Sequence, residues 1–216
     1  MSPALETELK LLAQDAALRA LAAVDRLGPA TLAAPRTVEE LDVYLDTRSG
    51  ALAAERWACR LRSREDRRTI SCKGPAEHPP GSALHRRPEV DGPAPAGPMR
   101  GAAGWPPSDA RDLVLRLAGD EPLVERVTLR QRRTERTAVA DGRDIATLSL
   151  DRVSVERGGA ALGAFAVVEL ELGDGVDAAS IDEVMAALLA WPGLVPDGLS
   201  KLERALALVP AAGAPR

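Results

Sequence analysis

The chain has 216 residues, and its 28 lysines and arginines against 32 aspartates and glutamates leave a formal charge of −4. This near balance gives the molecule no overall field that would draw it to nucleic acid or to a membrane surface. Aromatic residues make up only 2% of the chain, too few for the stacking surfaces of nucleic-acid and carbohydrate sites. We therefore expect no nucleic-acid partner, and a site for any other polyanion must be local.

Length and apolar content favour one globular domain, which we place at residues 1–210, before a disordered tail at 211–216. No apolar run approaches the ~20 residues of a membrane-spanning helix, and the N-terminus leads into charged residues rather than a signal-type segment. These features predict a cytoplasmic protein with no membrane partner. Its two cysteines, Cys59 and Cys72, are expected to be reduced thiols packed as small hydrophobic side chains.

The first predicted elements are a strand and a helix. Residues 1–12 alternate charged with apolar side chains at period two, which indicates a strand. Residues 15–27 carry apolar side chains at helical spacing, and the pair Gly28-Pro29 is typical of a helix end. We expect this helix to lie over a sheet.

The middle of the chain is predicted to be a meander followed by a loop. Residues 41–73 contain strand-like runs joined by short polar turns, which indicates antiparallel strands. Residues 74–107 are rich in proline and glycine, so we predict a loop with one short strand at 84–91, because proline lacks a donor for the ladder. Ser108 is expected to cap a helix that ends at Gly119.

The last third is predicted to return to strands and then to end in helices. Strand patterns cover residues 124–155, on both sides of a hairpin signal, and residues 164–172. Two capping boxes, one beginning at Ser180 and one at Ser200, predict two C-terminal helices, since each pairs a side-chain acceptor with unpaired backbone amides.

Three predicted strands carry charged side chains that alternate with apolar ones. They are Glu6, Glu8 and Lys10, then Arg60 and Arg62, then Glu169 and Glu171. Side chains two positions apart share one face of a strand. Such a face can point to solvent in an antiparallel sheet, but its recurrence favours the interior of a barrel. An interior with both signs of charge suits a divalent ion bound by carboxylates and phosphate oxygens bound by lysine and arginine.

Eight short motifs occur in an order that is typical of one family. They are Glu6-x-Glu8-x-Lys10, Tyr44-Leu45-Asp46-Thr47, Arg60-x-Arg62, Lys73-Gly74-Pro75, Leu84-His85-Arg86-Arg87-Pro88-Glu89, Leu150-Asp151-Arg152, Glu169-Leu170-Glu171 and Leu199-Ser200-Lys201. The ordered set resembles the CYTH domain of the triphosphate tunnel metalloenzymes, from Leu5 to about Leu208. The resemblance implies an α+β fold, an antiparallel eight-stranded β-barrel with surrounding helices. It also implies metal-dependent hydrolysis of inorganic triphosphate or short polyphosphate, as in bacterial inorganic triphosphatases.

The resemblance also implies roles for particular residues, with Mg²⁺ or Mn²⁺ as cofactor. The acidic, metal-binding positions are matched by Glu6, Glu8, Asp151, Glu169 and Glu171. The phosphate-binding positions are matched by Lys10, Arg60, Arg62, Lys73, Arg133 and Lys201, with Glu89 as an acidic position of the tunnel wall that we place with the substrate-binding set. From these sets we expect Glu6, Glu8, Lys10 and Arg133 to act in catalysis, through positioning and electrostatic stabilisation.

Two positions depart from the family pattern. The family's C-terminal acidic motif often has three glutamates, whereas this chain has Val167 before Glu169 and Glu171. We prefer Glu169 and Glu171 as ligands, with a register shifted by two residues as the alternative. Family members often have a basic residue two places after Arg133, where this chain has Glu135, so chain-length preference is an open question.

Several other polar or aromatic residues are not assigned to the site. Arg130, Arg132 and Arg136 have the opposite parity to Arg133 and are predicted to lie on a solvated outer face. His78 and His85 have no metal ligand at suitable spacing and are predicted to be solvated imidazoles. Two aromatic residues outside the site, Trp57 and Trp191, are predicted to be packing residues.

Alternatives remain for the function. One is a class IV adenylate cyclase or a thiamine or nucleoside triphosphatase, each of which needs room for an organic group beyond the phosphates. Another is a polyphosphate-binding module without catalysis. Many bacterial relatives also carry a helical CHAD domain after the tunnel, so such a domain elsewhere is a possible partner.

Overall fold

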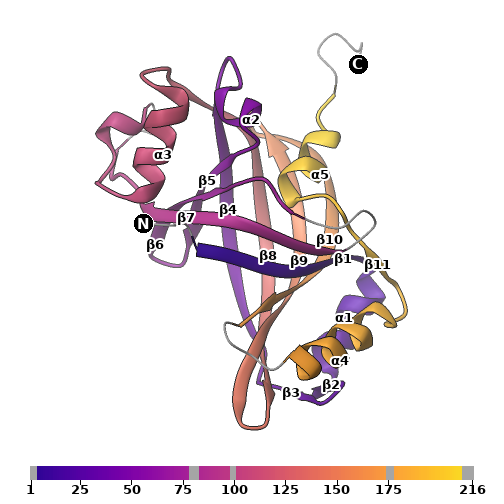
Figure 1. The fold of residues 1–216 in the computed structure, drawn as a ribbon. Coiled ribbons are helices and arrows are strands. Elements are labelled where there is room, and N and C mark those ends of the chain that lie inside the picture. The colour runs from indigo at the N-terminus through magenta and orange to yellow at the C-terminus, as the bar shows by residue number, and fades with distance from the viewer. Residues whose placement is uncertain (1–3, 78–82, 98–100, 174–177, 211–216) are drawn as a thin grey trace.

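The computed structural model describes residues 4–77, 83–97, 101–173 and 178–210. Within this part of the chain, eight antiparallel strands close into a barrel (Figure 1). These strands are β1 (Ala4–Ala13), β4 (Arg36–Thr47), β5 (Ala58–Arg64), β6 (Arg67–Lys73), β7 (Leu84–Pro93), β8 (Leu123–Ala140), β9 (Arg143–Arg157) and β10 (Ala160–Leu172). The ring runs β8-β4-β5-β6-β7-β1-β10-β9, and β9 pairs with β8 to close it. The predicted antiparallel eight-stranded barrel is therefore confirmed.

Shorter elements surround the barrel. The hairpin of β2 (Arg26–Leu27) and β3 (Ala30–Leu32) extends the sheet from β8, and β11 (Leu194–Pro196) pairs with β1. The helices are α1 (Asp15–Ala23), α2 (Ala51–Ala54), α3 (Asp109–Ala118), α4 (Ala178–Leu189) and α5 (Lys201–Ala207), with a 3-10 helix at Ala102–Gly104. Helices α1 and α4 gather beside the β2-β3 hairpin, whereas α3 lies at the opposite side of the molecule (Figure 1). No helix in the described segments is long and apolar enough to cross a membrane.

The structure corrects the predicted first helix. It ends at Ala23 rather than Leu27, because Arg26 and Leu27 form β2. Gly28 adopts a left-handed conformation with φ of +57° and, with Pro29, makes the turn from β2 to β3. The glycine-proline pair therefore marks a hairpin turn, since both a helix end and a turn use glycine at positive φ.

Other boundaries shift more modestly. Strand β7 runs to Pro93, two residues beyond the predicted short strand in the region 74–107, which also contains the 3-10 helix. Strand β4 begins at Arg36, before the predicted meander, and the one-turn helix α2 connects β4 to β5. Helix α4 begins at Ala178, so Ser180 lies inside the helix rather than at its N-cap.

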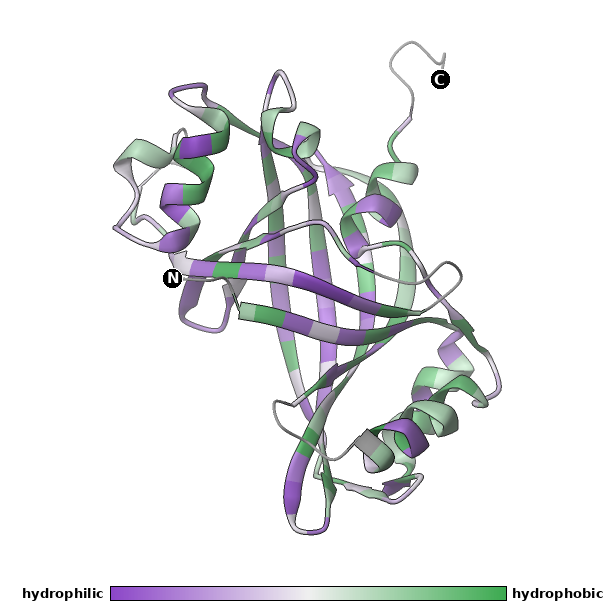
Figure 2. Ribbon diagram, viewed as in Figure 1, coloured by the Kyte–Doolittle hydropathy of each residue, from purple (hydrophilic) through white to green (hydrophobic). Residues whose placement is uncertain are grey.

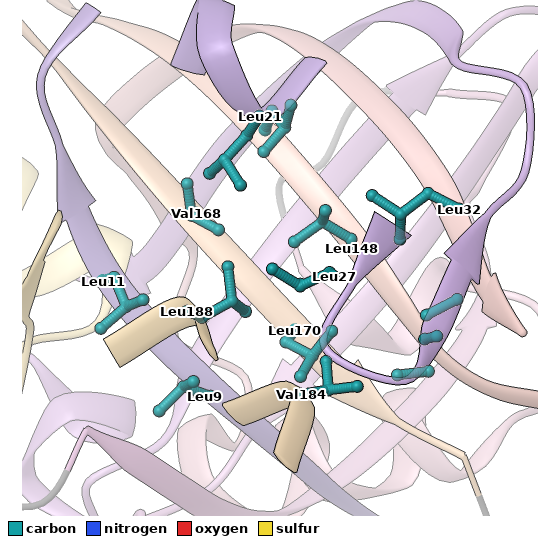
Figure 3. Close-up of a cluster of buried hydrophobic side chains, with 14 of the residues drawn as sticks. Leu9, Leu11, Leu21, Leu27, Leu32, Leu148, Val168, Leu170, Val184 and Leu188 are labelled. Atoms are coloured by element: carbon teal, nitrogen blue, oxygen red, sulfur yellow. The ribbon is translucent and has the colours of Figure 1, made fainter. Parts of the chain in front are cut away.

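The apolar faces of β1 and β10 pack outward under the helices. Leu9 and Leu11 of β1, with Val168 and Leu170 of β10, are buried in the largest hydrophobic cluster. Helix α4 covers them with Val184 and Leu188, and α1 adds Leu21 (Figure 3). Burial of each such side chain contributes about 1.5–3 kcal/mol. Because neighbours in a strand point to opposite faces, this outward core directs the charged residues of β1 and β10 into the barrel, and hydrophilic and hydrophobic residues alternate along β1 (Figure 2).

A second hydrophobic cluster lies under α2 and α3. It contains Cys59 of β5 and Cys72 of β6, which are register partners on neighbouring strands. Both are free thiols and fully buried, so the prediction that they pack as small hydrophobic side chains is confirmed. The contact with Cys72 and burial both raise the pKa of the Cys59 thiol well above its ordinary value. Trp57 packs against this cluster and Trp191 against the first one, as predicted.

Candidate active site

The barrel encloses a cavity of about 560 Å³ with a charged lining. Eight lysine and arginine side chains line it against six glutamates, so more basic than acidic side chains face the cavity in a chain whose formal charge is −4. Its predicted lining residues are Glu6, Glu8, Lys10, Arg60, Arg62, Lys73, Glu89, Arg133, Glu169, Glu171 and Lys201. The cavity therefore brings together every predicted site residue except Asp151, which lies behind the lining.

The period-two alternation of β1 and its register with both neighbours build one wall of the cavity. Glu8 lies opposite Glu171 of β10 on one side and opposite His85 of β7 on the other. Lys10 lies opposite Glu169, and their side chains approach to 3.5 Å. Because residues directly opposite in a ladder have side chains on the same face, the register alone places these charges around one space.

Lysine and arginine side chains form a second wall, on which Lys73 and Arg87 are each paired with carboxylates. Lys73 forms an ion pair with Glu6 and lies 3.4 Å from Glu89. Arg87 donates from Nε to Glu6 at 3.0 Å and from Nη2 to Glu8 at 2.6 Å. Burial lowers the pKa of Lys73, and the nearby positive charge of Arg60 lowers it further. These groups form a preassembled set of donors that an incoming phosphate chain could share with the glutamates.

Sequence reasoning gave Arg87 no role, although it belongs to a quoted motif. Its register partner is Glu6, so it faces the cavity from β7, and it is buried there. The signal was its parity: Arg87 and Glu89 are two positions apart and share a strand face, whereas Arg86 is exposed. Arg87 is thus a further candidate for phosphate binding.

Gly74 explains the Lys73-Gly74-Pro75 motif. A Cβ atom at position 74 would lie 2.6 Å from Pro88 Cγ and 3.0 Å from the Trp57 ring. Only glycine allows the chain after Lys73 to pass this close to β7. The tight crossing holds the strand end that carries Lys73 at the cavity wall.

A four-residue ion-pair cluster lies deep in the barrel. Arg133 binds Asp151 through two parallel hydrogen bonds of 2.8 and 2.7 Å and also reaches Glu169 at 3.0 Å. Lys201 Nζ lies 2.6 Å from Asp151 and 2.7 Å from Glu169. Burial alone would raise the pKa of Asp151, but Lys201 and Arg133 outweigh it and lower this pKa below its ordinary value. Asp151 has no exposed surface and is held by two cations, so its metal-binding role stays a prediction.

Lys201 reaches this cluster because α5 begins in a fixed orientation. The Ser200 hydroxyl accepts the Glu203 N–H at 3.2 Å, and the Glu203 carboxylate accepts the Ser200 N–H at 2.7 Å. This reciprocal pairing is the predicted capping box, and it is confirmed. Lys201 is the first residue of α5 and is buried. A positive charge at a helix N-terminus is locally unfavourable, and the carboxylates of Asp151 and Glu169 offset this cost.

Two acidic residues on β4 were missed by sequence reasoning. Asp42 accepts two hydrogen bonds of 2.7 Å from Arg62 and one of 2.7 Å from Gln131, and Arg60 approaches to 3.4 Å. Burial alone would raise the pKa of Asp42, but Arg60 and Arg62 outweigh it and lower this pKa well below its usual range. Glu40 lies 3.1 Å from Arg62. Both could have been found from their parity with Tyr44 on the same strand.

The residues that best suit a divalent ion are Glu6, Glu8 and Glu171. Within the segments that the structure describes, no three acidic, histidine or cysteine side chains are grouped closely enough to hold a metal as they stand, since most carboxylates are paired with cations. Glu171 makes none of the ion pairs found in these segments. Burial and the negative charges of Glu6 and Glu8 raise its pKa, against a smaller lowering by Lys73. Mg²⁺ or Mn²⁺ would offset the mutual repulsion of these carboxylates, once Glu6 and Glu8 exchange their contacts with Lys73 and Arg87 for the ion.

The structure corrects the prediction for His85. This residue is 2% exposed rather than solvated, and its Nε2 lies 2.8 Å from the Asp197 carbonyl oxygen. Burial lowers the pKa of the imidazole, partly opposed by that hydrogen bond. The segment before α5 covers His85, which the local pattern could not show. His78 lies outside the described residues.

Arg136 is also a correction. It was predicted on a solvated outer face, but it is 3% exposed. Its guanidinium donates to the carbonyl oxygens of Ala33 at 2.7 Å and Leu32 at 3.0 Å, and also to that of Val24. The β2-β3 hairpin covers this part of β8 and buries the side chain. Arg130 and Arg132 are exposed, as predicted.

Solved structures with a similar fold extend over almost the whole chain. A putative adenylyl cyclase from Hippeastrum, described as having a dominant triphosphatase activity, is 20% identical with a TM-score of 0.68, covering 94% of this chain and 95% of that one. A putative adenylate cyclase from Bacillus halodurans is 18% identical with a TM-score of 0.59, covering 94% and 98%. A protein from Pyrococcus horikoshii is 17% identical with a TM-score of 0.51, also covering 94% and 98%.

These likenesses show a shared fold. A comparison with curated protein sequences found no match. The family profile of the CYTH domain matches residues 4–204, which is most of the barrel and its helices. Fold, ordered motifs and profile agree, and the chain belongs to the CYTH family.

Proposed function

We propose that this protein hydrolyses a phosphoanhydride bond of inorganic triphosphate or a short polyphosphate inside the barrel cavity, with Mg²⁺ or Mn²⁺. The observation that carries the proposal is the cavity lining, with eight basic side chains against six glutamates in a chain of net negative charge. A short chain of phosphates has many oxygen acceptors and several negative charges in a small volume. The lining supplies matching donors, and the glutamates supply ligands for a metal ion.

In this proposal the basic residues bind and align the phosphates. Arg60, Arg62, Lys73 and Arg133 would exchange part of their carboxylate contacts for phosphate oxygens, with Lys10 and Lys201 beside them. Each donor is already held by a carboxylate, so little reorganisation is needed when substrate binds. This preorganisation would hold the phosphorus and the attacking water in line.

The carboxylates of the cavity would bind the metal ion, and one of them would also accept a proton. Glu6, Glu8 and Glu171 would hold the ion, with Glu169 and Asp151 deeper in the barrel. A bound divalent ion would neutralise charge on the phosphate oxygens and lower the pKa of a water molecule. One carboxylate of the pair Glu6 and Glu8 is also the candidate to accept the proton of that water, because both line the cavity and would lie beside the bound ion.

An organic triphosphate is a second candidate substrate, favoured by apolar residues in the same lining. Ala53, Trp57, Leu202 and Leu206 line part of the cavity, and Leu206 is exposed. Asp46 supports this part, since its carboxylate accepts the N–H groups of Leu52 at 2.9 Å and Ala53 at 3.2 Å at the start of α2. A base or a thiamine ring could pack against Trp57 while its phosphates enter the barrel.

The deciding experiment measures phosphate release from inorganic triphosphate, ATP and thiamine triphosphate, with Mg²⁺ or Mn²⁺ and with EDTA. We expect rapid release from inorganic triphosphate that EDTA abolishes. Faster turnover of an organic triphosphate, lost in Trp57→Ala, would select the second candidate. Tight binding of triphosphate without turnover on either metal would overturn the hydrolase proposal and leave a non-catalytic polyphosphate-binding module.

A further inference from the structure

A second ion-pair cluster lies next to the cavity, on strands β4, β5 and β8. Arg64 of β5 donates to Glu135 of β8 through two hydrogen bonds, the longer of 2.7 Å, and lies 3.2 Å from Glu40 of β4. The side chains of Arg64 and Glu135 are 25% and 19% exposed. None of these three residues lines the cavity. The cluster is therefore a partly solvated boundary beyond Arg62 and Arg133.

Arg64 is the third member of an inward-facing row. Arg60, Arg62 and Arg64 alternate with Leu61 and Ser63 along β5, so all three share a face. The first two line the cavity, and Arg64 stands about 7 Å further along the strand. By position Arg64 would be the next phosphate contact after Arg62.

Glu135 prevents Arg64 from taking that place, because its side chain is 19% exposed to the incoming phosphate chain, whereas Asp42, the partner of Arg62, is fully buried behind the lining. The two carboxylate oxygens of Glu135 occupy the guanidinium in a parallel pair, and Glu40 contacts the same Nη1 atom. In addition, Glu135 shares the inward face of β8 with Arg133, whose Nη1 lies 4.0 Å away. Its negative charge would therefore repel a phosphate that extended past Arg133.

We propose that Glu135 sets the upper length of the phosphate chain that the cavity accepts. It does so by neutralising Arg64 and by placing a carboxylate where a further phosphate would bind. The inference rests on the proposed function, and it names the substrate class more closely: triphosphate in preference to tetraphosphate and longer chains. Glu135 acts here as a specificity-determining residue rather than a catalytic one.

The test compares Glu135→Gln with the unmodified protein on inorganic triphosphate and tetraphosphate. The substitution keeps the shape of the side chain and removes its charge. Because one charge-assisted contact and one repulsion change together, we expect the ratio of kcat/KM for tetraphosphate over triphosphate to rise about tenfold or more. Glu156→Gln is the matched control, since Glu156 pairs with the exposed Arg130 on the outside of the barrel, and it should leave the ratio unchanged.

The double variant Glu135→Gln/Arg64→Gln separates the proposed cause from a change of shape. If the freed Arg64 binds the additional phosphate, the second substitution should remove that contact. The ratio of kcat/KM for tetraphosphate over triphosphate should then return most of the way to its value in the unmodified protein. A purely structural role of the pair would instead lower both activities together. A ratio that is unchanged in Glu135→Gln, with cooperative unfolding intact, overturns the inference.

Calorimetric binding of triphosphate and tetraphosphate without metal makes this result independent of turnover. If the protein binds both but hydrolyses neither, the proposed hydrolase function fails, and the affinity ratio still decides the role of Glu135. The role of Glu135 is supported if Glu135→Gln strengthens binding of tetraphosphate relative to triphosphate by about tenfold. An unchanged ratio contradicts it.

Discussion

Glu8 of β1 lies directly opposite Glu171 of β10 in the ladder, and both face the cavity. Like charges at directly opposite positions destabilise a sheet. Arg87 relieves Glu8 with a hydrogen bond of 2.6 Å, but Glu171 makes no ion pair among the described residues. Glu171 is solvent-exposed and lines the cavity, so its carboxylate is accessible to a cation and is not committed to an ion pair within those segments.

Glu171→Gln tests this relationship. Removing one of two opposed charges should stabilise the metal-free protein by about 0.2–1 kcal/mol. It should also weaken the stabilisation by Mn²⁺, because one oxygen ligand loses its charge. Thermal unfolding with and without Mn²⁺ measures both effects, with Glu156→Gln as the control. An unchanged shift with Mn²⁺ would remove Glu171 from the metal site.

Arg60→Ala tests phosphate binding from β5. The loss of a charge-assisted contact in a buried site should lower turnover of triphosphate by at least ~10². Asp42 keeps its bonds from Arg62 and Gln131, so the fold should persist. Circular dichroism checks that the fold is retained, and phosphate release measures the loss of turnover. Arg130→Ala, on the exposed outer face of β8, should change neither, and unaltered kinetics in Arg60→Ala would exclude Arg60 from the site.

Asp42→Asn tests the electrostatics of the barrel interior at neutral pH. The change removes the buried counterion that Arg60 and Arg62 share, while Glu40 stays near Arg62 and Glu89 near Arg60. We therefore expect a loss of at most about 3–5 kcal/mol in the free energy of unfolding. Urea unfolding at pH 7 measures it. The control is Glu65→Gln, because Glu65 forms an exposed pair with Arg36 and its loss should change the free energy of unfolding little. Asp46→Asn would not serve as a control, because Asp46 accepts a backbone N–H at the start of α2.

The same variant should show a defined pH dependence. The pKa of Asp42 is lower in the folded protein than its ordinary value, so its contribution is complete above the unfolded pKa of about 3.9. The contribution is lost as the pH falls from there toward the folded-state pKa. The stability difference between the unmodified protein and Asp42→Asn should therefore be constant above pH ~5 and shrink below pH ~4. A difference that grows on acidification would contradict the assignment.

Val167→Glu tests the register of the C-terminal acidic motif. Val167 is fully buried and lies opposite Asp151, whereas Glu169 and Glu171 line the cavity. A carboxylate at 167 would be buried beside another one, so we expect destabilisation by several kcal/mol, on the order of 3, and no gain in Mn²⁺ affinity. Val167→Ala measures the part that comes from lost packing. A stable Val167→Glu protein with tighter Mn²⁺ binding would instead place position 167 in the metal site.

For β1, β5 and β10, the side of the strand that faces the cavity followed from the sequence. Glu6, Glu8 and Lys10 line it as the alternation predicts, and so do Arg60 and Arg62. The reason is local: the backbone of any strand sends successive side chains to opposite faces, so parity can be determined without knowing the partners. The capping box at Ser200 followed in the same way, because its two hydrogen bonds span three residues.

Which charges meet could not be determined locally. Arg87, Asp42 and Glu40 acquire their roles from register with strands that lie far away in the sequence, and His85 and Arg136 are buried by segments that pack over them. Gly28-Pro29 is equally compatible with a helix end and a hairpin turn until β3 pairs with β8. By itself the sequence determined which side chains share the charged face of a strand, and it contained the ordered motifs of the family. Tertiary structure alone decided pairing and burial, because those depend on closure of the barrel and on long-range contacts.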